Sequence, residues 1–188
     1  MKSKRRSARW LAVPAILLAA LLLLYRPQIE QKLFYPWDYY ELISRAAQER
    51  GVSNALLRGL ILTESSFDPR AVSSVGARGL TQIMPETFEW LQSKTGDALP
   101  LDALFEPETS VRYGALLLQL LLDEFEAPET ALAAYHAGRG RVNQWLRDPA
   151  ISPDGRTLAK IPAPDTRHYV DKVMKAYAKY DEFIQRNR

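Results

Sequence analysis

The chain has 188 residues, of which 47% are hydrophobic and 25% are charged, and its formal net charge is +3. This composition is typical of a globular protein and excludes a wholly disordered chain. Cysteine is absent, which excludes disulfides, thiol nucleophiles and every zinc or iron–sulfur site built on cysteine.

The excess positive charge is concentrated at the N-terminus. Five basic residues lie within the first nine positions, which hold no acid: Lys2, Lys4, Arg5, Arg6 and Arg9. The rest of the chain has 20 basic and 22 acidic residues. Because contacts to nucleic-acid phosphates need clustered Lys and Arg, this balance argues strongly against a nucleic-acid-binding domain.

An apolar segment follows this basic tip. Residues 10–25 read WLAVPAILLAALLLLY and carry no charge. As a helix the segment would be roughly 24 Å long, slightly short of the ~30 Å hydrocarbon core of a membrane. Arg9 and Arg26 at its ends can extend to the two interfaces. We therefore predict a single transmembrane signal anchor over 10–25, with residues 1–9 in the cytoplasm and the remaining chain on the extracytoplasmic (periplasmic or cell-wall) side.

A cleaved signal peptide is the alternative reading of the same segment, since a basic region and an apolar region are both present. No small-x-small cleavage site follows Leu24, because the next residues are Tyr25, Arg26 and Pro27. We favour the uncleaved anchor, which makes this a protein of the cell membrane.

Residues 26–37 are predicted to form a short stalk, and a helical domain is predicted over 38–188. Asp38 and Glu41 form a plausible capping box for a first helix that Gly51 ends. Ser53 is a suitable cap for a second helix, whose apolar positions are Leu56, Leu57, Leu60 and Ile61.

The remaining pattern is also helical. Further helices are predicted from Pro85 to near Gly96, over 107–126, from Pro128 to Gly138, over 142–146, and from Asp165 to near Gln185. No alternating run bounded by turn residues predicts a strand. The predicted fold class is therefore all-α, with a domain of about 150 residues.

Glu64 is the first candidate for catalysis. It lies four residues after Leu60 and seven after Leu57, which places a carboxyl group on the apolar face of its helix. Burial there would raise its pKa, as a general acid near neutral pH requires. Periodicity alone slightly favours the alternative, a glutamate at the rim of that face directed into solvent. Metal-ligand spacings, phosphate-binding glycine motifs and a nucleophile elbow are all missing from the sequence, so no metal and no cofactor are expected.

Four segments carry a resemblance to a known family. In chain order they are ESSFDPRAVSSVGARGLTQIMPET (64–87), LFEPETSVRYGALLL (104–118), AYHAG (134–138) and IPAPDTRHYV (161–170). Together they resemble the lytic transglycosylases with a lysozyme-like catalytic domain, the soluble-lytic-transglycosylase (SLT) family, over roughly residues 38–180. The resemblance implies a goose-type/SLT lysozyme-like helical fold and an enzyme that acts on the glycan strands of peptidoglycan.

The resemblance also implies the reaction. The β-1,4 bond between N-acetylmuramic acid (MurNAc) and N-acetylglucosamine (GlcNAc) would be cleaved with formation of a 1,6-anhydro-MurNAc end. Glu64 would first protonate the glycosidic oxygen and then, as a carboxylate, take the proton from the attacking C6 hydroxyl. Position by position, the substrate-binding residues implied are Ser65, Ser73, Gln82, Met84, Tyr135 and Tyr169.

The sequence departs from the family pattern at several places. Thr81 stands where Met is usual, Ser110 and His136 replace Asn, and Asp165 replaces Glu. We expect His136 and Asp165 to tune substrate geometry without abolishing activity, because Glu64 and Gln82 are kept.

Two alternative functions stay open. One is a goose-type lysozyme that hydrolyses the same bond, and the other is a catalytically retired protein that only binds peptidoglycan. The expected partners are peptidoglycan and, through the N-terminal helix, the membrane, with no nucleic acid; the sequence identifies no protein partner.

Overall fold

The computed structural model describes residues 7–186, except for the side chains of residues 7–13, 22, 27, 28 and 31. Most of the predicted basic tip, residues 1–6, therefore lies outside the described residues. The chain divides into two compact units, Met1–Pro36 and Trp37–Arg188.

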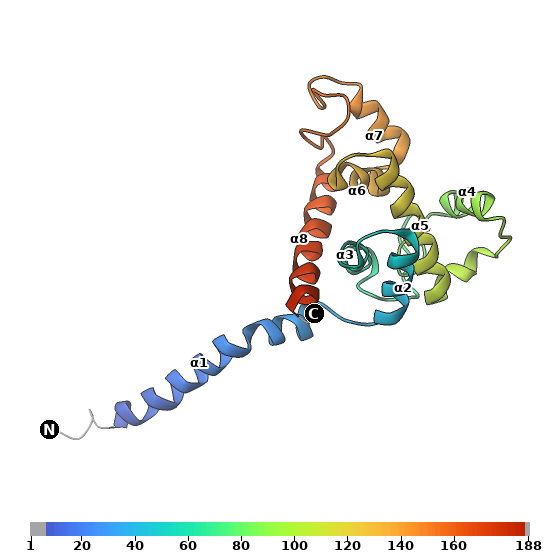
Figure 1. Ribbon diagram of the computed structural model, residues 1–188. Coiled ribbons are helices and arrows are strands. Elements are labelled where there is room, and N and C mark those ends of the chain that lie inside the picture. Colours follow the sequence, from blue (N-terminus) through green and yellow to red (C-terminus); the bar gives the residue numbers. More distant parts are fainter. Residues whose placement is uncertain (1–6, 187–188) are drawn as a thin grey trace. The chain divides into compact units, whose positions relative to one another are not determined.

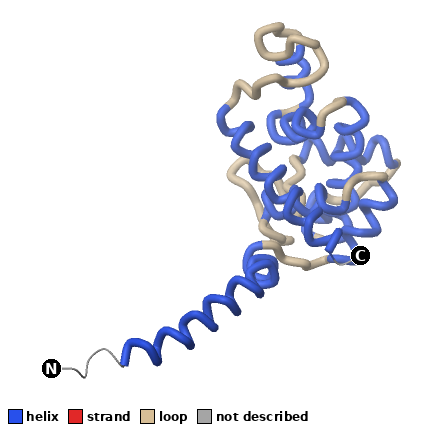
Figure 2. Tube along the Cα trace, turned by 60° about the vertical axis from the view of Figure 1, so that its left-hand side comes forward, coloured by secondary structure: helices blue, strands red, loops and turns tan. Residues whose placement is uncertain are grey.

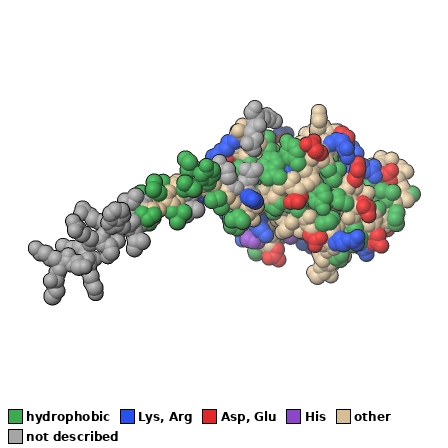
Figure 3. Space-filling model, turned by 90° about the horizontal axis from the view of Figure 1, so that it is seen from below, with side chains coloured by type: hydrophobic (Ala, Val, Ile, Leu, Met, Phe, Trp, Pro, Cys, Tyr) green, Lys and Arg blue, Asp and Glu red, His purple; other side chains and the backbone are tan. Residues whose placement is uncertain are grey.

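The first unit contains one helix, α1 (Ser7–Phe34), which continues through most of the predicted stalk. Its large apolar side chains are exposed on the described part of the helix (Figure 3): Ile16, Leu17, Leu18, Leu21, Leu23 and Leu24. Within the described residues, no helix is long and apolar enough to cross a membrane. The predicted anchor over 10–25 includes positions 10–13 and 22, whose side chains lie outside the described set, so the anchor stays a prediction.

The second unit is helical throughout its regular structure (Figure 2). Residues 7–186 contain no strand, and only isolated bridges join position 78 to positions 72 and 83. The all-α fold class is thus confirmed. The helices are α2 (Tyr40–Arg50), α3 (Asn54–Ser65), α4 (Pro85–Thr95), the 3-10 helix η1 (Leu101–Phe105), α5 (Pro107–Glu124), α6 (Pro128–Ala137), α7 (Arg139–Leu146) and α8 (Pro164–Arg186).

Several helix ends follow the predicted signals. The Ser53 hydroxyl accepts the backbone N–H of Leu56 at 3.3 Å, which caps α3. Gly51 and Gly96 end α2 and α4 in the left-handed conformation. Because glycine has no Cβ, this conformation costs it little.

Three local predictions were wrong or incomplete. The capping box at Asp38 does not form, because α2 begins after Tyr39, which has φ 55° and makes no side-chain cap. Helix α7 begins at Arg139, three residues earlier than predicted. Its first turn contains two arginines and a glycine, so no apolar pattern marks it. The short 3-10 helix η1 was not predicted, because its five residues are too few to show a periodic pattern.

Helix α3 lies in the centre of the second unit, and its most extensive packing is along α8 (Figure 1). Gly59 permits this close approach. A Cβ atom at Gly59 would lie 3.0 Å from the Val173 carbonyl oxygen, closer than nearly all real Cβ contacts. The backbones of α3 and α8 are therefore in direct contact.

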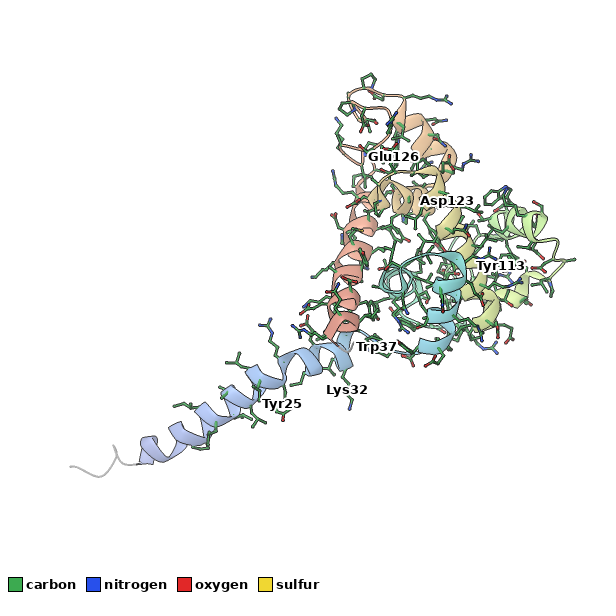
Figure 4. All side chains as sticks on the ribbon, in the orientation of Figure 1. Tyr25, Lys32, Trp37, Tyr113, Asp123 and Glu126 are labelled. Atoms are coloured by element: carbon green, nitrogen blue, oxygen red, sulfur yellow. The ribbon has the colours of Figure 1, made fainter. Side chains whose placement is uncertain are left out.

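Tyr113 joins α5 to the end of α4 (Figure 4). Its side chain is completely buried. The phenol donates to Asp97 Oδ2 at 2.5 Å, and the ring packs edge-on against Phe88 with 4.8 Å between centroids. These contacts hold α4 against α5.

A buried arginine lies at the start of the unit. The Arg58 guanidinium on α3 is fully buried beneath the rings of Trp37, Tyr40 and Tyr180, 4.9, 5.0 and 5.8 Å from their centroids. Its Nε donates to Asn54 Oδ1 at 3.0 Å, while Nη1 and Nη2 have no hydrogen-bond partner among the described residues. Cation–π attraction therefore replaces part of the lost hydration. The contact also ties Trp37 to the helix that carries Glu64.

Candidate active site

Glu64 lies in the last turn of α3 and is half-buried. The phenol of Tyr169 on α8 donates to Glu64 Oε1 at 2.6 Å. Burial raises the pKa of Glu64 to about 7, and the Tyr169 hydrogen bond opposes this shift. A carboxyl group with such a pKa can both give and accept a proton near neutral pH.

Tyr135 on α6 provides a second phenol. Its hydroxyl donates to the Thr81 carbonyl oxygen at 2.7 Å. Burial, and secondly the charge of Glu64, raise the pKa values of both Tyr135 and Tyr169 well above the usual value. Both phenols therefore remain protonated donors beside the carboxyl group.

The two predicted serines are bound to the protein backbone. Ser65 donates to the Leu80 carbonyl oxygen at 2.8 Å, which joins the end of α3 to the following loop. Ser73 lies within that loop, and its hydroxyl accepts the Ala77 N–H at 3.0 Å. Ser65 is thus adjacent to Glu64 and fixes the loop, while Ser73 closes a turn inside it.

Gln82 also holds this loop. It adopts φ 48°, and its Nε2 donates to the carbonyl oxygens of Ala71 at 3.0 Å and Gly79 at 2.9 Å. Met84, two residues later, is half-buried and immediately precedes α4. The side chain of Gln82 therefore joins two parts of the loop between α3 and α4.

Thr81 and Ser110, two departures from the family pattern, lie against each other. Thr81 N–H donates to Ser110 Oγ at 3.2 Å, and Thr81 Oγ1 donates to the Ser110 carbonyl oxygen at 2.9 Å. Both side chains are fully buried. Since the Thr81 carbonyl accepts the Tyr135 phenol, this pair helps to place Tyr135. That both positions depart from the family pattern is the sequence signal that could have indicated the contact between Thr81 and Ser110.

A cleft of about 200 Å³ opens beside Tyr135. It lies between α4, α5 and α6 and the start of α7, and its lining residues are Thr87, Trp90, Leu117, Leu121, Ala134, Tyr135, Gly138 and Arg139. Trp90 is 38% exposed, and an exposed indole in an open cleft is suited to packing on an apolar ring face. Sequence reasoning missed Trp90 as a site residue, although it is a large apolar side chain next to the buried Leu91.

Comparisons with known proteins show the family of the chain. Residues 41–154 match the family described as the Transglycosylase SLT domain. The chain belongs to this family. The soluble lytic murein transglycosylase of Salmonella typhimurium is 34% identical over 154 residues, which cover 80% of this chain and 24% of that protein. The membrane-bound lytic murein transglycosylase C of Actinobacillus pleuropneumoniae is 32% identical over 166 residues, 76% of this chain and 46% of that protein.

Two solved structures have the same fold. An inactive Glu-to-Gln mutant of the lytic transglycosylase Slt from Pseudomonas aeruginosa matches with a TM-score of 0.73 and 32% identity, over 82% of this chain and 26% of that one. The 70 kDa soluble lytic transglycosylase from Escherichia coli matches with a TM-score of 0.71 and 30% identity, over 80% and 25%. The predicted lysozyme-like SLT fold is thereby confirmed. This chain spans about a quarter of the length of those soluble relatives.

His136 of this SLT domain lies beside Tyr169. The two rings are 4.5 Å apart between centroids and inclined by 31°. His136 Nδ1 is 3.1 Å from the Thr166 hydroxyl. Partial burial lowers the pKa of His136, and the charge of Asp165 opposes this shift.

The second unit therefore brings Glu64, Tyr135 and Tyr169 together from three helices. Ser65 and Gln82 hold the neighbouring loop, with Ser73 in a turn of that loop and Met84 at its end. In the described part of the chain, no group of three or more His, Asp and Glu side chains could hold a metal ion.

Proposed function

We propose that this SLT domain is a peptidoglycan lytic transglycosylase that cleaves the MurNAc-β-1,4-GlcNAc bond and leaves a 1,6-anhydro-MurNAc end. The observation that carries the proposal is the half-buried Glu64 carboxyl, whose pKa is about 7 and whose Oε1 lies 2.6 Å from the Tyr169 phenol oxygen. The relatives named as lytic murein transglycosylases support the same reaction.

In the proposed reaction Glu64 gives its proton to the glycosidic oxygen as the bond from that oxygen to C1 of MurNAc breaks. The C6 hydroxyl of the same sugar attacks C1, and the Glu64 carboxylate takes the hydroxyl proton. Because the nucleophile belongs to the substrate, the reaction gains the entropic advantage of proximity and needs no water. Glu64 ends the cycle protonated.

A single carboxyl group is enough for this reaction, whereas hydrolysing glycosidases generally use two. Burial and the Tyr169 phenol account for the shifted pKa of Glu64, and no carboxylate is among its causes. This arrangement favours internal transfer over hydrolysis. In the proposal, Tyr169 orients Glu64, and Tyr135, whose phenol proton is donated to the Thr81 carbonyl, turns its oxygen lone pairs toward the positive charge that develops on the sugar.

The other site residues are proposed to shape the glycan groove. Ser65 and Gln82 hold the loop that forms one wall, Ser73 keeps its turn, and Met84 contributes an apolar surface at its end. Trp90 extends the groove along the cleft beside Tyr135. Indole and thioether groups suit the apolar faces of sugar rings.

Product analysis tests this proposal. The detergent-solubilised full chain would be incubated with purified sacculi, and released muropeptides would be measured by mass spectrometry. We expect products lighter than the hydrolysed ones by one water, and none from a folded Glu64→Gln variant. Reducing ends would instead identify a hydrolase, and tight sacculus binding without release would identify a retired binding protein. A Glu64→Gln variant as active as the parent would exclude Glu64 as the acid.

We also propose that the N-terminal segment anchors the domain to the membrane. Support comes from the uncharged run over 10–25, the exposed leucines of α1 and the relative named as membrane-bound. The full chain should resist alkaline extraction from membranes, and a Leu17→Arg/Leu18→Arg variant should be released. N-terminal sequencing of the mature protein distinguishes the anchor from a cleaved signal peptide.

A further inference from the structure

Three side chains from three helices lie in a continuous series that ends at the proposed acid. His136 of α6 packs on the ring of Tyr169 of α8, with 4.5 Å between centroids. Tyr169 in turn donates its phenol proton to Glu64 of α3 at 2.6 Å. Among the described residues no hydrogen bond joins His136 to Glu64, and Tyr169 contacts both of them.

The imidazole ring contacts two residues of α8, Tyr169 by ring packing and Thr166 through Nδ1. Its Nδ1 lies 3.1 Å from the Thr166 hydroxyl, one turn before Tyr169 on α8. The neighbouring Tyr135 is bonded to the Thr81 carbonyl, which fixes this end of α6. Thr166 and Tyr169 are both buried, whereas His136 is exposed. The ring can therefore act as a support for the Tyr169 phenol.

We propose that His136 is a positioning residue that holds the Tyr169 phenol on Glu64 and thereby sets the proton affinity of the acid. The catalytic consequence rests on the proposed function, whereas the effect on Glu64 does not. The phenol hydrogen bond favours the ionised carboxylate, so its presence lowers the pKa that burial raises. If the supporting ring is removed, the phenol gains rotational freedom, the bond weakens and Glu64 holds its proton to higher pH.

The titratable groups that face His136 are Asp165 and Tyr169, both from α8, while Tyr135 precedes it on its own helix. Arg139 follows on α7 and is bonded to Glu124. Tyr135 and Tyr169 stay protonated near neutral pH, because burial raises their pKa values. The neutral imidazole of His136 therefore acts on the neutral phenol of Tyr169 by packing, and repulsion between charges does not contribute.

The test is a titration of the Glu64 carboxyl carbon by ¹³C NMR on the full chain, with the signal assigned by its loss in Glu64→Gln. The series comprises the parent, Tyr169→Phe, His136→Ala and the double variant. We expect Tyr169→Phe to raise the midpoint of the Glu64 titration by about one pH unit. His136→Ala should raise the same midpoint by roughly half as much. The double variant should match Tyr169→Phe, because His136 acts only through the phenol.

Three further variants separate the contributions. His136→Phe keeps a ring and should restore most of the parent midpoint, whereas His136→Asn keeps a hydrogen-bonding group toward Thr166 and should not. His168→Ala is the matched control, since His168 is the other histidine of the chain and is exposed on the same helix as Tyr169. Circular dichroism of each variant confirms that it is folded.

The inference is overturned if His136→Ala leaves the Glu64 midpoint at the parent value, if its shift adds in full to that of Tyr169→Phe, or if Tyr169→Phe has no effect. Because the titration uses no substrate, its outcome is independent of whether the chain cleaves glycan. A parent that releases no muropeptides but shows the expected midpoints refutes the proposed function and leaves the role of His136 intact. An active parent with unmoved midpoints refutes only the role of His136.

Discussion

A Cβ atom on Gly59 would lie 2.8 Å from the backbone nitrogen of Tyr177. This is a contact between the backbones of α3 and α8, and it sets the distance between the two helices. Glu64 belongs to α3 and Tyr169 to α8, so the 2.6 Å hydrogen bond between them depends on this approach. A glycine outside the site thus helps to determine the geometry of the proposed acid.

We expect Gly59→Ala to lower the free energy of unfolding by about 1–3 kcal/mol, because a methyl group has to push two backbones apart. Activity on sacculi should fall as well, since Tyr169 moves away from Glu64. Gly140→Ala is the control, because nothing lies within 4 Å of its Cβ position on α7. Urea unfolding of both variants measures the difference, and equal stabilities would contradict the account of the contact.

The raised pKa of Glu64 makes stability depend on pH. The folded chain holds this proton up to about pH 7, whereas the pKa of an unperturbed glutamate is 4.5. Between these values the folded state binds more protons, so stability falls as pH rises, by up to about 1.4 kcal/mol per pH unit from this group. Glu64→Gln removes that dependence.

The free energy of unfolding of Glu64→Gln, minus that of the parent, should therefore increase from pH 4.5 to about 7 and then level off, after a total rise of roughly 3 kcal/mol. Denaturant unfolding at a series of pH values measures it. Glu89→Gln, at an exposed position of α4, provides the control. A flat difference for Glu64→Gln would mean that the carboxyl group is hydrated.

Arg58 is a buried cation with few hydrogen bonds. Methionine, an unbranched apolar side chain, removes the desolvated charge while filling much of the space beneath Trp37, and replacements of buried charges by apolar residues are often neutral or stabilising. We expect Arg58→Met to be at least as stable as the parent, and Arg58→Ala to lose about 2–5 kcal/mol through the cavity that it leaves. Thermal unfolding compares the two. A large loss in Arg58→Met would show that the rings of Trp37, Tyr40 and Tyr180 stabilise the cation more than burial costs.

Trp90 contributes an exposed indole to the cleft beside Tyr135. We expect Trp90→Ala to raise KM for glycan strands about tenfold, equivalent to about 1.4 kcal/mol, with kcat and stability nearly unchanged. Val75→Ala, another exposed apolar side chain at 71% exposure, is the control. An unchanged KM would place the glycan outside this cleft.

The sequence predicted those parts of the molecule that have a local physical cause. Proline and glycine marked helix ends because their backbone preferences act within one or two residues, and Glu64 stood out because helical periodicity relates it to Leu57 and Leu60. The contact between Gly59 and α8 has no such signal, since it depends on a partner more than a hundred positions away. Similarly, the roles of Ser65 and Gln82 could not be anticipated, because motif matching does not reveal which backbone carbonyls their side chains bind.

The end of α3 has a consequence for the acid that it carries. Ser66 and Phe67 follow in succession with φ 52° and 65°, so the helix ends at Ser65, one residue after Glu64. Glu64 consequently lies at the negative pole of its own helix dipole, where the free carbonyl groups repel an anion. The peptide bonds of α3 thus add to the effect of burial in retaining the proton. Extending α3 by one further turn would move the negative end of the helix dipole away from Glu64. The pKa of Glu64 would then fall, and its carboxylate would be a weaker base.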